Sequence, residues 1–490
     1  MKTLTASDIG FYYLPSKCSR RFDCRRRGLP EAEPDPYQEV LRVLGKRHED
    51  RHRQTLEPLL DLSSGLIQDR IQATRNALRE GYAKIYQPVL TADAPFDSDT
   101  QITGVPDFLL REKEGYVVRD CKTSLRINDK DHKEILEQLD LYGWLVEVNT
   151  GHSPTRLEVL AGDGTIHALE YGHGQRAHDT LLKAQEVIDG GFTGYEPVGW
   201  SKCQGCAYRQ HCWDDAVKAC DPAVVCDVDQ ATAIALRELG VQDYRELPNR
   251  LTLDALANLR KLRGKQLVRI GDKAAESALA HASALASNQA KLLKRPDIPA
   301  SDNCVMFDLE GLPPQLDDTE KIYLWGMQVC GTNPSSAIQA VADFGANGDK
   351  NGWNRFLEGA STVFQNHGDL PFVHWFHYER DHVKKYIERY GDAEGIAARV
   401  LANLCDLLVV TKEAVVLPTY SYSIKQVEKL AGFRRTLPES NGAWSMAEYI
   451  KAVETEDVDL RNKTMDKIML YNREDLEATW AVLQWLGGMR

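Results

Sequence analysis

The sequence predicts a mixed α/β (α+β) protein in which a helical middle region joins two mixed regions. Alternating apolar and polar residues predict hairpins at residues 101–124 and 156–171. Three further strand-like segments follow in the C-terminal half, at residues 304–311, 322–330 and 337–344. Residues 223 to about 285 show helical periodicity alone.

The remaining elements follow from the same periodicities. Residues 36–56 and 132–148 carry apolar side chains at helical spacing, and residues 371–376 predict a strand followed by helices. Residues 283–303 are predicted as a linker, because polarity rises there and periodicity lapses.

The chain length agrees with this division into three regions. At roughly 150 residues per domain, a typical size, 490 residues indicate about three domains. We expect the domains to span residues 1–222, 223–295 and 296–490.

Composition excludes several classes of protein. Hydrophobic residues make up 43% of the chain and charged residues 27%, as in ordinary soluble proteins. No apolar run approaches the ~20 residues of a membrane span, and the N-terminal segment lacks the apolar core of a signal peptide. We therefore expect a cytoplasmic protein. The phosphate-binding pattern G-x4-G-K-[ST] of ATP-driven motors does not occur, and the net charge of −12 argues weakly against a general nucleic-acid coat.

Positive charge is concentrated near the N-terminus. Residues 19–27 hold five arginines against one aspartate. A solvated basic surface explains this segment as well as nucleic-acid binding does. Its position directly after Cys18 favours a functional role, with Arg20 and Arg21 as nucleic-acid contacts.

Three of the 11 cysteines have metal-ligand spacing. Cys203, Cys206 and Cys212 form a C-x2-C-x5-C pattern, and a tetrahedral site or a cubane cluster needs a fourth thiolate. Cys18 is the best candidate for the fourth ligand, and its rivals are Cys24, Cys220 and Cys226. Buried packing is the expectation for the others, which are Cys121, Cys304, Cys330 and Cys405.

Two carboxylates and a lysine are predicted at the ends of adjacent strands. Asp107 follows Pro106, and Asp120 and Lys122 share one face of the next strand. Such carboxylates can hold a divalent cation, and the lysine can orient or deprotonate a water and stabilise charge on phosphorus. His48, in the preceding helix, offers a neutral imidazole ligand.

Two polar residues on a later helix fit the same cleft. Gln138 and Tyr142 lie four residues apart, so they share a helical face and can contact the nucleic-acid backbone. A surface hairpin with charged tips also produces a PD…D-x-K pattern, so the pattern alone leaves both interpretations open. The ordered series of all these residues between Cys18 and the cysteine trio favours a nuclease.

In this order the motifs resemble the iron–sulfur, RecB-like branch of the PD-(D/E)XK nucleases. The resemblance covers about residues 8–215 and implies a restriction-endonuclease-like core. The matching motifs are G-x-x-H-E at residues 45–49, PD at 106–107, D-x-K at 120–122 and Q-x3-Y at 138–142.

The resemblance implies two cofactors. It implies a [4Fe–4S] cluster that holds the two ends of the domain together, with zinc as the alternative, and its ligands are Cys18, Cys203, Cys206 and Cys212. It also implies DNA cleavage that depends on Mg²⁺ or Mn²⁺, with Lys122 in the catalytic role. The implied ligands of that cation are His48, Asp107, Asp120 and the carbonyl of Cys121.

A second set of acidic residues lies in the C-terminal half. Asp308 and Glu310 are two apart on a predicted strand, so both carboxylates face the same way. Tyr471 and Asp475 are four apart, on one face of a predicted helix. Glu379 follows a strand and offers a fourth carboxylate, with Asp381 as its rival.

Four carboxylates from distant segments suit a two-metal site. One cation activates water and the other stabilises the leaving oxygen, at a separation of about 3.5–4 Å. The hydroxyl of Tyr471 could hold the attacking water. Each of these short patterns also occurs in ordinary strands and amphipathic helices, and it is their combination in order that favours catalysis.

Residues from about 300 to 490 resemble the RNase H-like, DnaQ-type exonucleases of the D-E-D-D group. Tyr471, four residues before Asp475, matches the D-E-D-D-y subtype. Glu379 stands where this group usually has aspartate, but HYERD resembles the glutamate version found in RNase H-like domains fused to RecB-like nucleases. That fused family resembles the whole chain, and residues 420–428 match one of its segments, with Asp406 expected nearby and no role assigned to either.

The middle region carries a weaker pattern. Residues 236–267 resemble a helix-hairpin-helix-like element, in which a glycine turn offers backbone N–H groups to phosphate. A helical spacer is the alternative interpretation.

Three hypotheses follow for the function. The first is a metal-dependent nuclease with two active sites, which acts on single-stranded or end-bearing DNA, with RNA as the other candidate substrate. The second keeps one active site and makes the other domain a nucleic-acid-binding scaffold, and the third is a non-enzymatic iron–sulfur protein that binds nucleic acid. A helicase partner in trans is considered because no motor motif occurs, and the pathway, repair or defence, is not encoded in any motif.

Overall fold

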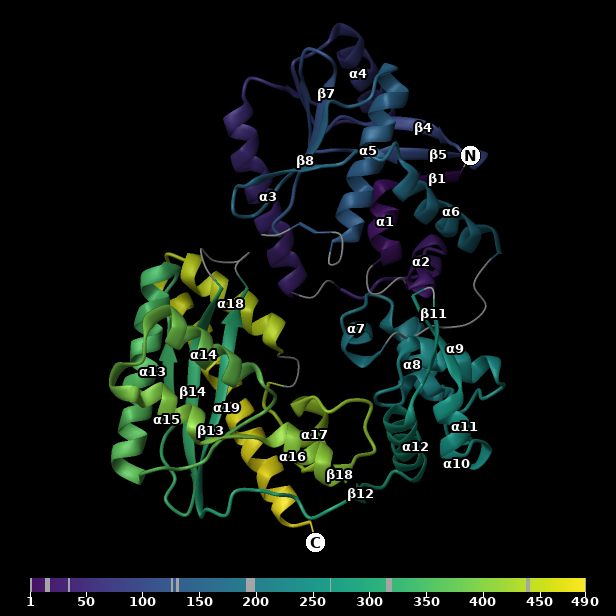
Figure 1. Cartoon of the computed structure of the whole chain (residues 1–490). Helices are drawn as coiled ribbons and strands as arrows, with labels where there is room; N and C mark the ends of the chain where they lie inside the picture. The colour runs from purple at the N-terminus through teal and green to yellow at the C-terminus, as the bar shows by residue number, and fades with distance from the viewer. Residues whose placement is uncertain are drawn as a thin grey trace. The chain divides into compact units, whose positions relative to one another are not determined.

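The computed structural model describes residues 2–13, 18–33, 36–124, 127–128, 132–190, 199–264, 266–313, 320–437 and 441–489. The chain divides into two compact units (Figure 1). The first consists of residues 1–34 and 38–218, and the second of residues 35–37 and 219–490.

The first unit contains a six-stranded mixed sheet with the order β2-β3-β6-β7-β8-β9. Its central strand β7 pairs antiparallel with β6 and parallel with β8. The strands are β2 (Leu60–Asp61), β3 (Lys84–Tyr86), β6 (Phe108–Arg111), β7 (Tyr116–Cys121), β8 (Arg156–Leu160) and β9 (Ile166–Leu169). A second sheet has the order β1-β5-β4 and consists of β1 (Lys2–Thr5), β5 (Asp97–Gly104) and β4 (Leu90–Ala94).

Helix α5 (Lys133–Thr150) is the central helix of this unit, because it contacts both sheets as well as helices α1 and α6. Its side chains Leu139, Leu141 and Leu145 are fully buried, although they point to different sides of the helix. The other helices are α1 (Ala6–Tyr13), α2 (Ser19–Arg26), α3 (Pro36–Leu56), α4 (Ile67–Glu80), α6 (Gln175–Gly190), α7 (Trp200–Gln204), η1 (Arg209–His211) and α8 (Trp213–Lys218).

The predicted elements of this region are confirmed with one exception. The helices expected at 36–56 and 132–148 are α3 and α5, and the hairpin at 156–171 is β8–β9. The hairpin expected over 101–124 is wrong at its start, because residues 101–104 belong to β5, which pairs with β1 and β4. The alternation continues across both strands, so it does not reveal that the partner strand changes.

The second unit contains a five-stranded sheet with the order β15-β14-β13-β16-β17. The first three strands are antiparallel neighbours, and β16 and β17 run parallel to β13. The strands are β13 (Asn303–Leu312), β14 (Lys321–Gly331), β15 (Ile338–Val341), β16 (Phe372–His374) and β17 (Leu404–Asp406). The three strand segments expected from 304 to 344 are therefore confirmed.

Helices cover both faces of this sheet. Val305 and Phe307 of β13 belong to the apolar cluster that includes α13, whereas Cys304 and Met306 belong to the cluster that includes α19. By alternation, Asp308 and Glu310 also lie on the face toward α19. The helices are α13 (Gly345–His367), α14 (Tyr378–Tyr390), η3 (Ala393–Gly395), α15 (Ile396–Ala402), α16 (Leu407–Ala414), α17 (Ile424–Leu430), α18 (Gly442–Glu454) and α19 (Val458–Gly487).

The middle region belongs to this second unit and is not helical throughout. It contains η2 (Pro222–Val224), α9 (Gln230–Glu238), α10 (Leu247–Arg250), α11 (Leu253–Asn258) and α12 (Asp272–Ser287). The expectation of helices alone is wrong at residues 260–269, where β10 (Arg260–Arg263) and β11 (Gln266–Arg269) form an antiparallel hairpin. Gly264 has a left-handed φ of 64°, which turns the chain back where a helix would continue.

The predicted linker also contains regular structure. Helix α12 continues to Ser287 and ends at Asn288, whose φ of 51° is left-handed. Residues Lys291–Leu292 form β12, which pairs with β18 (Val415–Val416). The polar composition of this segment reflects exposure rather than lack of structure. Overall, the predicted mixed α/β class is confirmed.

Candidate active sites

The first candidate site lies where β7 ends. Asp120 and Cys121 are the last residues of β7, Lys122 follows them, and Asp107 directly precedes β6. Since β6 and β7 are antiparallel, the start of one strand meets the end of the other. The amide of Asp107 donates to Asp120 Oδ1 at 3.3 Å, and the amide of Cys121 donates to Asp107 Oδ2 at 2.7 Å.

Lys122 connects the carboxylates to α5. Its Nζ lies 2.6 Å from Asp120 Oδ2 and donates to Gln138 Oε1 at 2.9 Å. Burial opposes the charged form of Lys122, but the charges of Asp120 and Asp107 outweigh burial and raise its pKa. The ammonium form is therefore favoured, which suits stabilisation of charge on phosphorus better than deprotonation of water.

The carboxylates repel each other in a buried place. Burial, together with the charges of Asp120 and Glu49, raises the pKa of Asp107 well above its ordinary value. Asp120 itself is only 2% exposed. A divalent cation would relieve this repulsion, so the residues fit such an ion.

Gln87, Tyr86 and Glu49, which were not predicted as site residues, complete this site. Gln87 Nε2 donates to Asp107 Oδ1 at 3.0 Å and to Glu49 Oε1 at 3.1 Å, and the hydroxyl of Tyr86 donates to the same Glu49 oxygen. Glu49 could have been predicted as a site residue, because it is the last residue of the G-x-x-H-E motif. Gln87 could not, because no motif surrounds it. Its φ of 52° is a feature of the folded chain only.

The predicted imidazole ligand contacts the backbone. His48 Nε2 lies 3.3 Å from the carbonyl oxygen of Leu160, which is the neighbour of Cys121 on β8. Among the described residues, this site has no three ligand side chains whose ligand atoms all lie within 4.8 Å of one another. A role of His48 as a metal ligand stays a prediction.

Gln138 and Tyr142 lie on the face of α5 that is directed to the carboxylates. Gln138 accepts the hydrogen bond from Lys122. Burial and the charges of Asp120 and Asp107 raise the pKa of Tyr142 well above its ordinary value, so its hydroxyl stays protonated near those groups.

The four predicted cluster cysteines come from two segments that contact each other. Arg20 Nη2 donates to the carbonyl oxygen of His211 at 3.1 Å, which links α2 to the segment before Cys212. Cys18 caps the N-terminus of α2, where its Sγ accepts from the amide of Arg21 at 3.4 Å. The buried thiols are those of Cys18, Cys203 and Cys212, and the thiol of Cys206 is half-buried.

Cys24 remains a rival ligand. It is buried, burial raises the pKa of its thiol, and Cys206 is one of the groups that act on it electrostatically. Arg20 and Arg21 contact the protein itself, since Arg20 also pairs with Asp23 at 3.4 Å and the Arg21 guanidinium lies 4.5 Å from the ring of Phe11. Their contact with nucleic acid therefore stays a prediction.

The second candidate site lies between β13 and α19. The carboxylates of Asp308, Glu310 and Asp475 offer ligand atoms that all lie within 4.8 Å of one another. Burial and the charges of Asp475 and Glu310 raise the pKa of Asp308 well above its ordinary value, and burial and Asp475 do the same to Glu310. Three mutually repelling carboxylates in a buried place fit one or more divalent cations.

Side chains of α19 and β14 position these carboxylates. Asn472 is fully buried and its Nδ2 donates to Asp308 Oδ2 at 2.8 Å. The hydroxyl of Tyr323 contacts Glu310 Oε2 at 3.4 Å. The hydroxyl of Tyr471 stays protonated, because burial and the charges of Asp475 and Glu310 raise its pKa well above the ordinary value.

Glu379 lies in the first turn of α14, which follows β16. It is 3% exposed, and its Oε2 lies 3.2 Å from Nδ1 of His374. Burial raises its pKa, His374 lowers it, and Asp406 acts on it as well, so Asp406 lies nearby as expected. The side chain of the rival Asp381 is 42% exposed and pairs with Arg380 at 3.1 Å, which favours Glu379 as the site residue.

A buried arginine contacts the last aspartate of this site. Arg435 Nη2 lies 2.6 Å from Asp475 Oδ1 and 2.7 Å from Glu428 Oε2, and its side chain is 4% exposed. Lys425 Nζ lies 5.0 Å from the ring centroid of Tyr471. Lys425 and Glu428 belong to the segment 420–428, whereas Arg435 follows it and has no motif that could reveal it.

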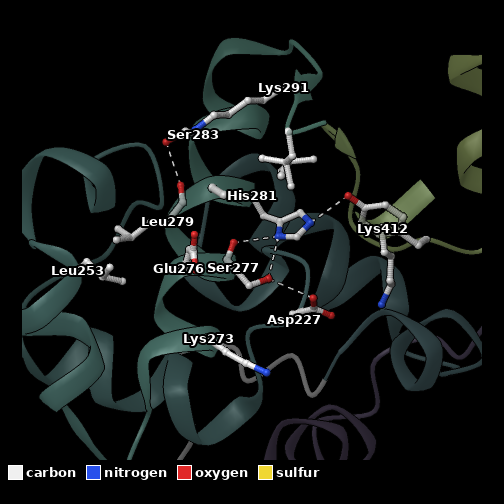
Figure 2. A pocket seen from close by; sticks show the side chains of 14 residues that line it. Asp227, Leu253, Lys273, Glu276, Ser277, Leu279, His281, Ser283, Lys291 and Lys412 are labelled. Carbon is white, nitrogen blue, oxygen red and sulfur yellow. Dashed lines mark hydrogen bonds between the residues drawn. The ribbon is translucent and has the colours of Figure 1, made fainter. Parts of the chain in front are cut away.

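A third cluster of potential ligands lies beside the pocket of Figure 2, which is lined by two of its residues, Asp227 and His281. Cys226, Asp227 and His281 offer ligand atoms within 4.8 Å of one another. Both ring nitrogens of His281 already have partners, since Nδ1 lies 2.9 Å from the carbonyl oxygen of Ser277 and Nε2 lies 3.2 Å from the hydroxyl of Tyr422 (Figure 2). The cluster therefore fastens α12 to the 420–428 segment and is not arranged as a cation site.

Two protein-family models match the chain. A PD-(D/E)XK nuclease superfamily model matches residues 17–213, and an RNase_H superfamily model matches residues 305–487. The chain thus contains a PD-(D/E)XK nuclease superfamily domain followed by an RNase_H superfamily domain, which is the predicted fused architecture. Two such domains support a metal-dependent nuclease with a nucleic-acid substrate.

The solved structure titled "Crystal structure of SSO0001" is similar to part of the chain, with 16% sequence identity and a TM-score of 0.24. The match covers 43% of this chain and 85% of the chain in that structure. No curated protein matches the sequence. In the described part of the chain, no helix is both long and apolar enough to cross a membrane.

Proposed function

We propose that this protein is a DNA exonuclease that hydrolyses phosphodiester bonds at two metal-dependent sites, one in each unit. The observation that carries the proposal is the convergence of the ligand atoms of Asp308, Glu310 and Asp475 within 4.8 Å of one another, where Glu310 and Asp475 are buried and Asp308 is half-buried. The electrostatic conflict between Asp107 and Asp120 supports the first site in the same way.

At the first site, Mg²⁺ or Mn²⁺ would be held by Asp107, Asp120 and His48, with the Cys121 carbonyl as a further ligand. A cation there would acidify a bound water and offset phosphate charge. Lys122 stabilises the negative charge that develops on the phosphoryl oxygens, because its ammonium form is favoured. Gln138 fixes the lysine through its 2.9 Å hydrogen bond.

At the second site, Asp308, Glu310, Glu379 and Asp475 would hold the cations. Asn472 fixes the carboxylate of Asp308, and His374 fixes that of Glu379. The hydroxyl of Tyr471 remains protonated and can orient the attacking water by donating or accepting a hydrogen bond.

We further propose that Cys18, Cys203, Cys206 and Cys212 hold a [4Fe–4S] cluster, with zinc as the alternative. Their donor set of four thiolates from two contacting segments suits either group. The cluster would join the start of the first unit to its end. Three domains, with residues 223–295 as the middle one, and a cytoplasmic location belong to the same proposal.

The test is a nuclease assay on end-labelled single and double strands of DNA, with RNA strands in parallel. Purified protein with Mg²⁺ or Mn²⁺ should shorten DNA from its ends, and the double variant D120A/D308A should lose this activity. Equal cutting by the double variant and the parent would reject the proposal. Tight binding without cleavage by the parent would support a non-enzymatic nucleic-acid-binding protein instead.

The ion pair between Arg435 and Asp475 favours a second candidate function. The buried guanidinium of Arg435 lies 2.6 Å from Asp475, which is a proposed metal ligand. It already neutralises the carboxylate that a cation would bind, so the second unit could act as a binding scaffold. The single variants decide between the two. Under the two-site proposal both D120A and D308A lose part of the activity, whereas full activity of D308A would identify the scaffold.

A further inference from the structure

The hairpin β10–β11 in the middle region has two different faces. Side chains alternate along each strand, and Arg260 lies opposite Arg269, Lys261 opposite Val268, and Leu262 opposite Leu267. Lys261 and Val268 are half-buried, whereas the residues of the other face are exposed. The exposed face therefore consists of two pairs, an arginine pair and a leucine pair.

The inner face fastens the hairpin to the fold. Lys261 Nζ donates to Asp229 Oδ2 at 2.6 Å and to Thr232 Oγ1 at 3.0 Å, at the start of α9. At the base of the hairpin, the amide of Ile270 donates to the carbonyl oxygen of Leu259 at 3.0 Å. The outer face is therefore presented on a supported two-stranded ribbon, labelled at β11 in Figure 1.

The outer face combines features that folding alone does not favour. Like charges directly opposite each other destabilise a strand pair, as Arg260 and Arg269 do. Leu262 is 58% exposed and Leu267 is 61% exposed. In the part of the chain that the structure describes, no carboxylate forms an ion pair with Arg260, Arg263 or Arg269, although the whole chain carries a net charge of −12.

Nucleic acid is the partner with the matching chemistry. Phosphates supply the anions that the arginines lack within the fold. Exposed leucines between cations are the side chains that other nucleic-acid-binding proteins insert between bases where stacking is interrupted. A two-stranded ribbon also has the width that a groove of the duplex admits.

We propose that the β10–β11 hairpin binds DNA at a frayed or forked end, with Arg260 and Arg269 on phosphates and the Leu262–Leu267 pair against the faces of unstacked bases. This rests on the proposed nuclease function for the identity of the substrate. The hairpin would hold the junction at which a free strand begins. A second copy of this chain is the competing occupant of the apolar face.

The experiment measures binding separately from cleavage. The full chain carrying D120A and D308A is titrated against end-labelled forked and blunt duplexes at several salt concentrations, and binding is followed by fluorescence anisotropy. Adding R260Q and R269Q should weaken binding and lower the slope of log Kd against log salt by about 0.7 to 0.9 for each lost phosphate contact. Adding L262S and L267S should leave that slope unchanged and abolish the preference for forked ends.

Matched controls carry the same changes elsewhere. K113Q with K350Q removes two exposed positive charges, and L66S with L460S removes two exposed leucines, of which Leu66 is 75% and Leu460 52% exposed. Both controls should bind like the parent. Circular dichroism melting of each variant shows whether it is folded, and the two hairpin pairs give independent readouts if one of them does not fold.

Parental affinity and salt slope in the R260Q/R269Q variant would overturn the proposal. So would a change in sedimentation without any change in DNA binding, because that result identifies a second copy as the occupant. If the parent protein does not cleave DNA, the proposed nuclease function is rejected. The proposal for the hairpin is still tested in that case, because the binding measurement needs no cleavage.

Discussion

Individual carboxyl groups in this protein owe their properties to burial next to one another. Asp308 and Glu310 lie two residues apart on β13, and Asp475 approaches them from α19. Burial raises the pKa of each of the three carboxyl groups, and the charges of neighbouring carboxylates raise those of Asp308 and Glu310 further. Arg435 acts in the opposite direction on Asp475 and on Glu310. The degree to which a bound cation neutralises the second site therefore depends on which of these carboxylates it contacts.

A histidine of the first unit predicts a pH dependence of stability. Burial, with the charge of Arg119 and the electrostatic effect of His48, lowers the pKa of His52 from 6.5 to about 4. Arg119 Nη1 lies 3.1 Å from His52 Nε2, so the neutral imidazole accepts its hydrogen bond. Below its ordinary pKa the unfolded chain binds a proton that the folded chain does not. The free energy of unfolding should therefore fall as the pH decreases from 6.5 to about 4, by up to about 3 kcal/mol.

Urea denaturation at several pH values checks this expectation. H52Q keeps an acceptor for Arg119 but has no titrating group, so its urea midpoint should fall less steeply than that of the parent over this interval. H152Q, which replaces an exposed histidine, is the control and should follow the parent. An H52Q midpoint that falls as steeply as that of the parent would show that His52 does not contribute.

At the scale of elements, a glycine lets a helix approach the central strand pair. Gly326 on β14 lies opposite Asp308 on β13. A Cβ atom at this position would lie 2.1 Å from Oδ1 of Asn472, the residue that holds Asp308. Asn472 is fully buried and cannot move aside easily. The small residue thus sets the distance between α19 and the sheet.

G326A should therefore disturb both stability and the second site. Overpacking of a buried contact costs about 1–3 kcal/mol, and a displaced Asn472 no longer fixes Asp308. We expect a lower urea midpoint and lower exonuclease activity, measured in a D120A background that reports the second site alone. G442A is the control in the same unit, because nothing lies within 4 Å of its added methyl group. Normal activity of G326A would show that the helix can shift without loss of function.

At the scale of the whole molecule, the proposed cluster would connect distant parts of the first unit. Cys18 lies at the start of that unit and Cys203, Cys206 and Cys212 lie near its end. Joining segments so far apart removes conformational freedom from the unfolded chain. The second unit has its own apolar clusters and does not depend on these cysteines.

C203S should accordingly lose iron and the visible absorbance of the anaerobically purified protein. Its first unit should unfold at a lower temperature, because the link between its ends is lost, while the second unit keeps its transition in calorimetry. C405S, which changes a half-buried cysteine of β17, should retain iron. Zinc in place of iron would identify the alternative group, and full iron content in C203S would rule out Cys203 as a ligand.

Sequence patterns predicted much of the fold and the relative placement of several candidate site residues. Strand alternation placed Asp308 and Glu310 on one face of β13, and helical spacing placed Gln138 and Tyr142 on one face of α5. Both patterns are local, so each can be read without knowledge of the partner element. The β10–β11 hairpin was missed because its apolar residues suit a helix equally well, and the turn at Gly264 decides between the two.

The sequence by itself determined the class of fold, the two superfamilies and the order of the acidic and cysteine motifs, because periodicity and spacing are properties of neighbouring residues. Only the tertiary structure decided that Gln87, Asn472 and Arg435 reach the carboxylates. These contacts join residues up to 164 positions apart, as between Asp308 and Asn472. Such contacts depend on how strands and helices pack, and packing between distant segments leaves no fixed spacing in the chain.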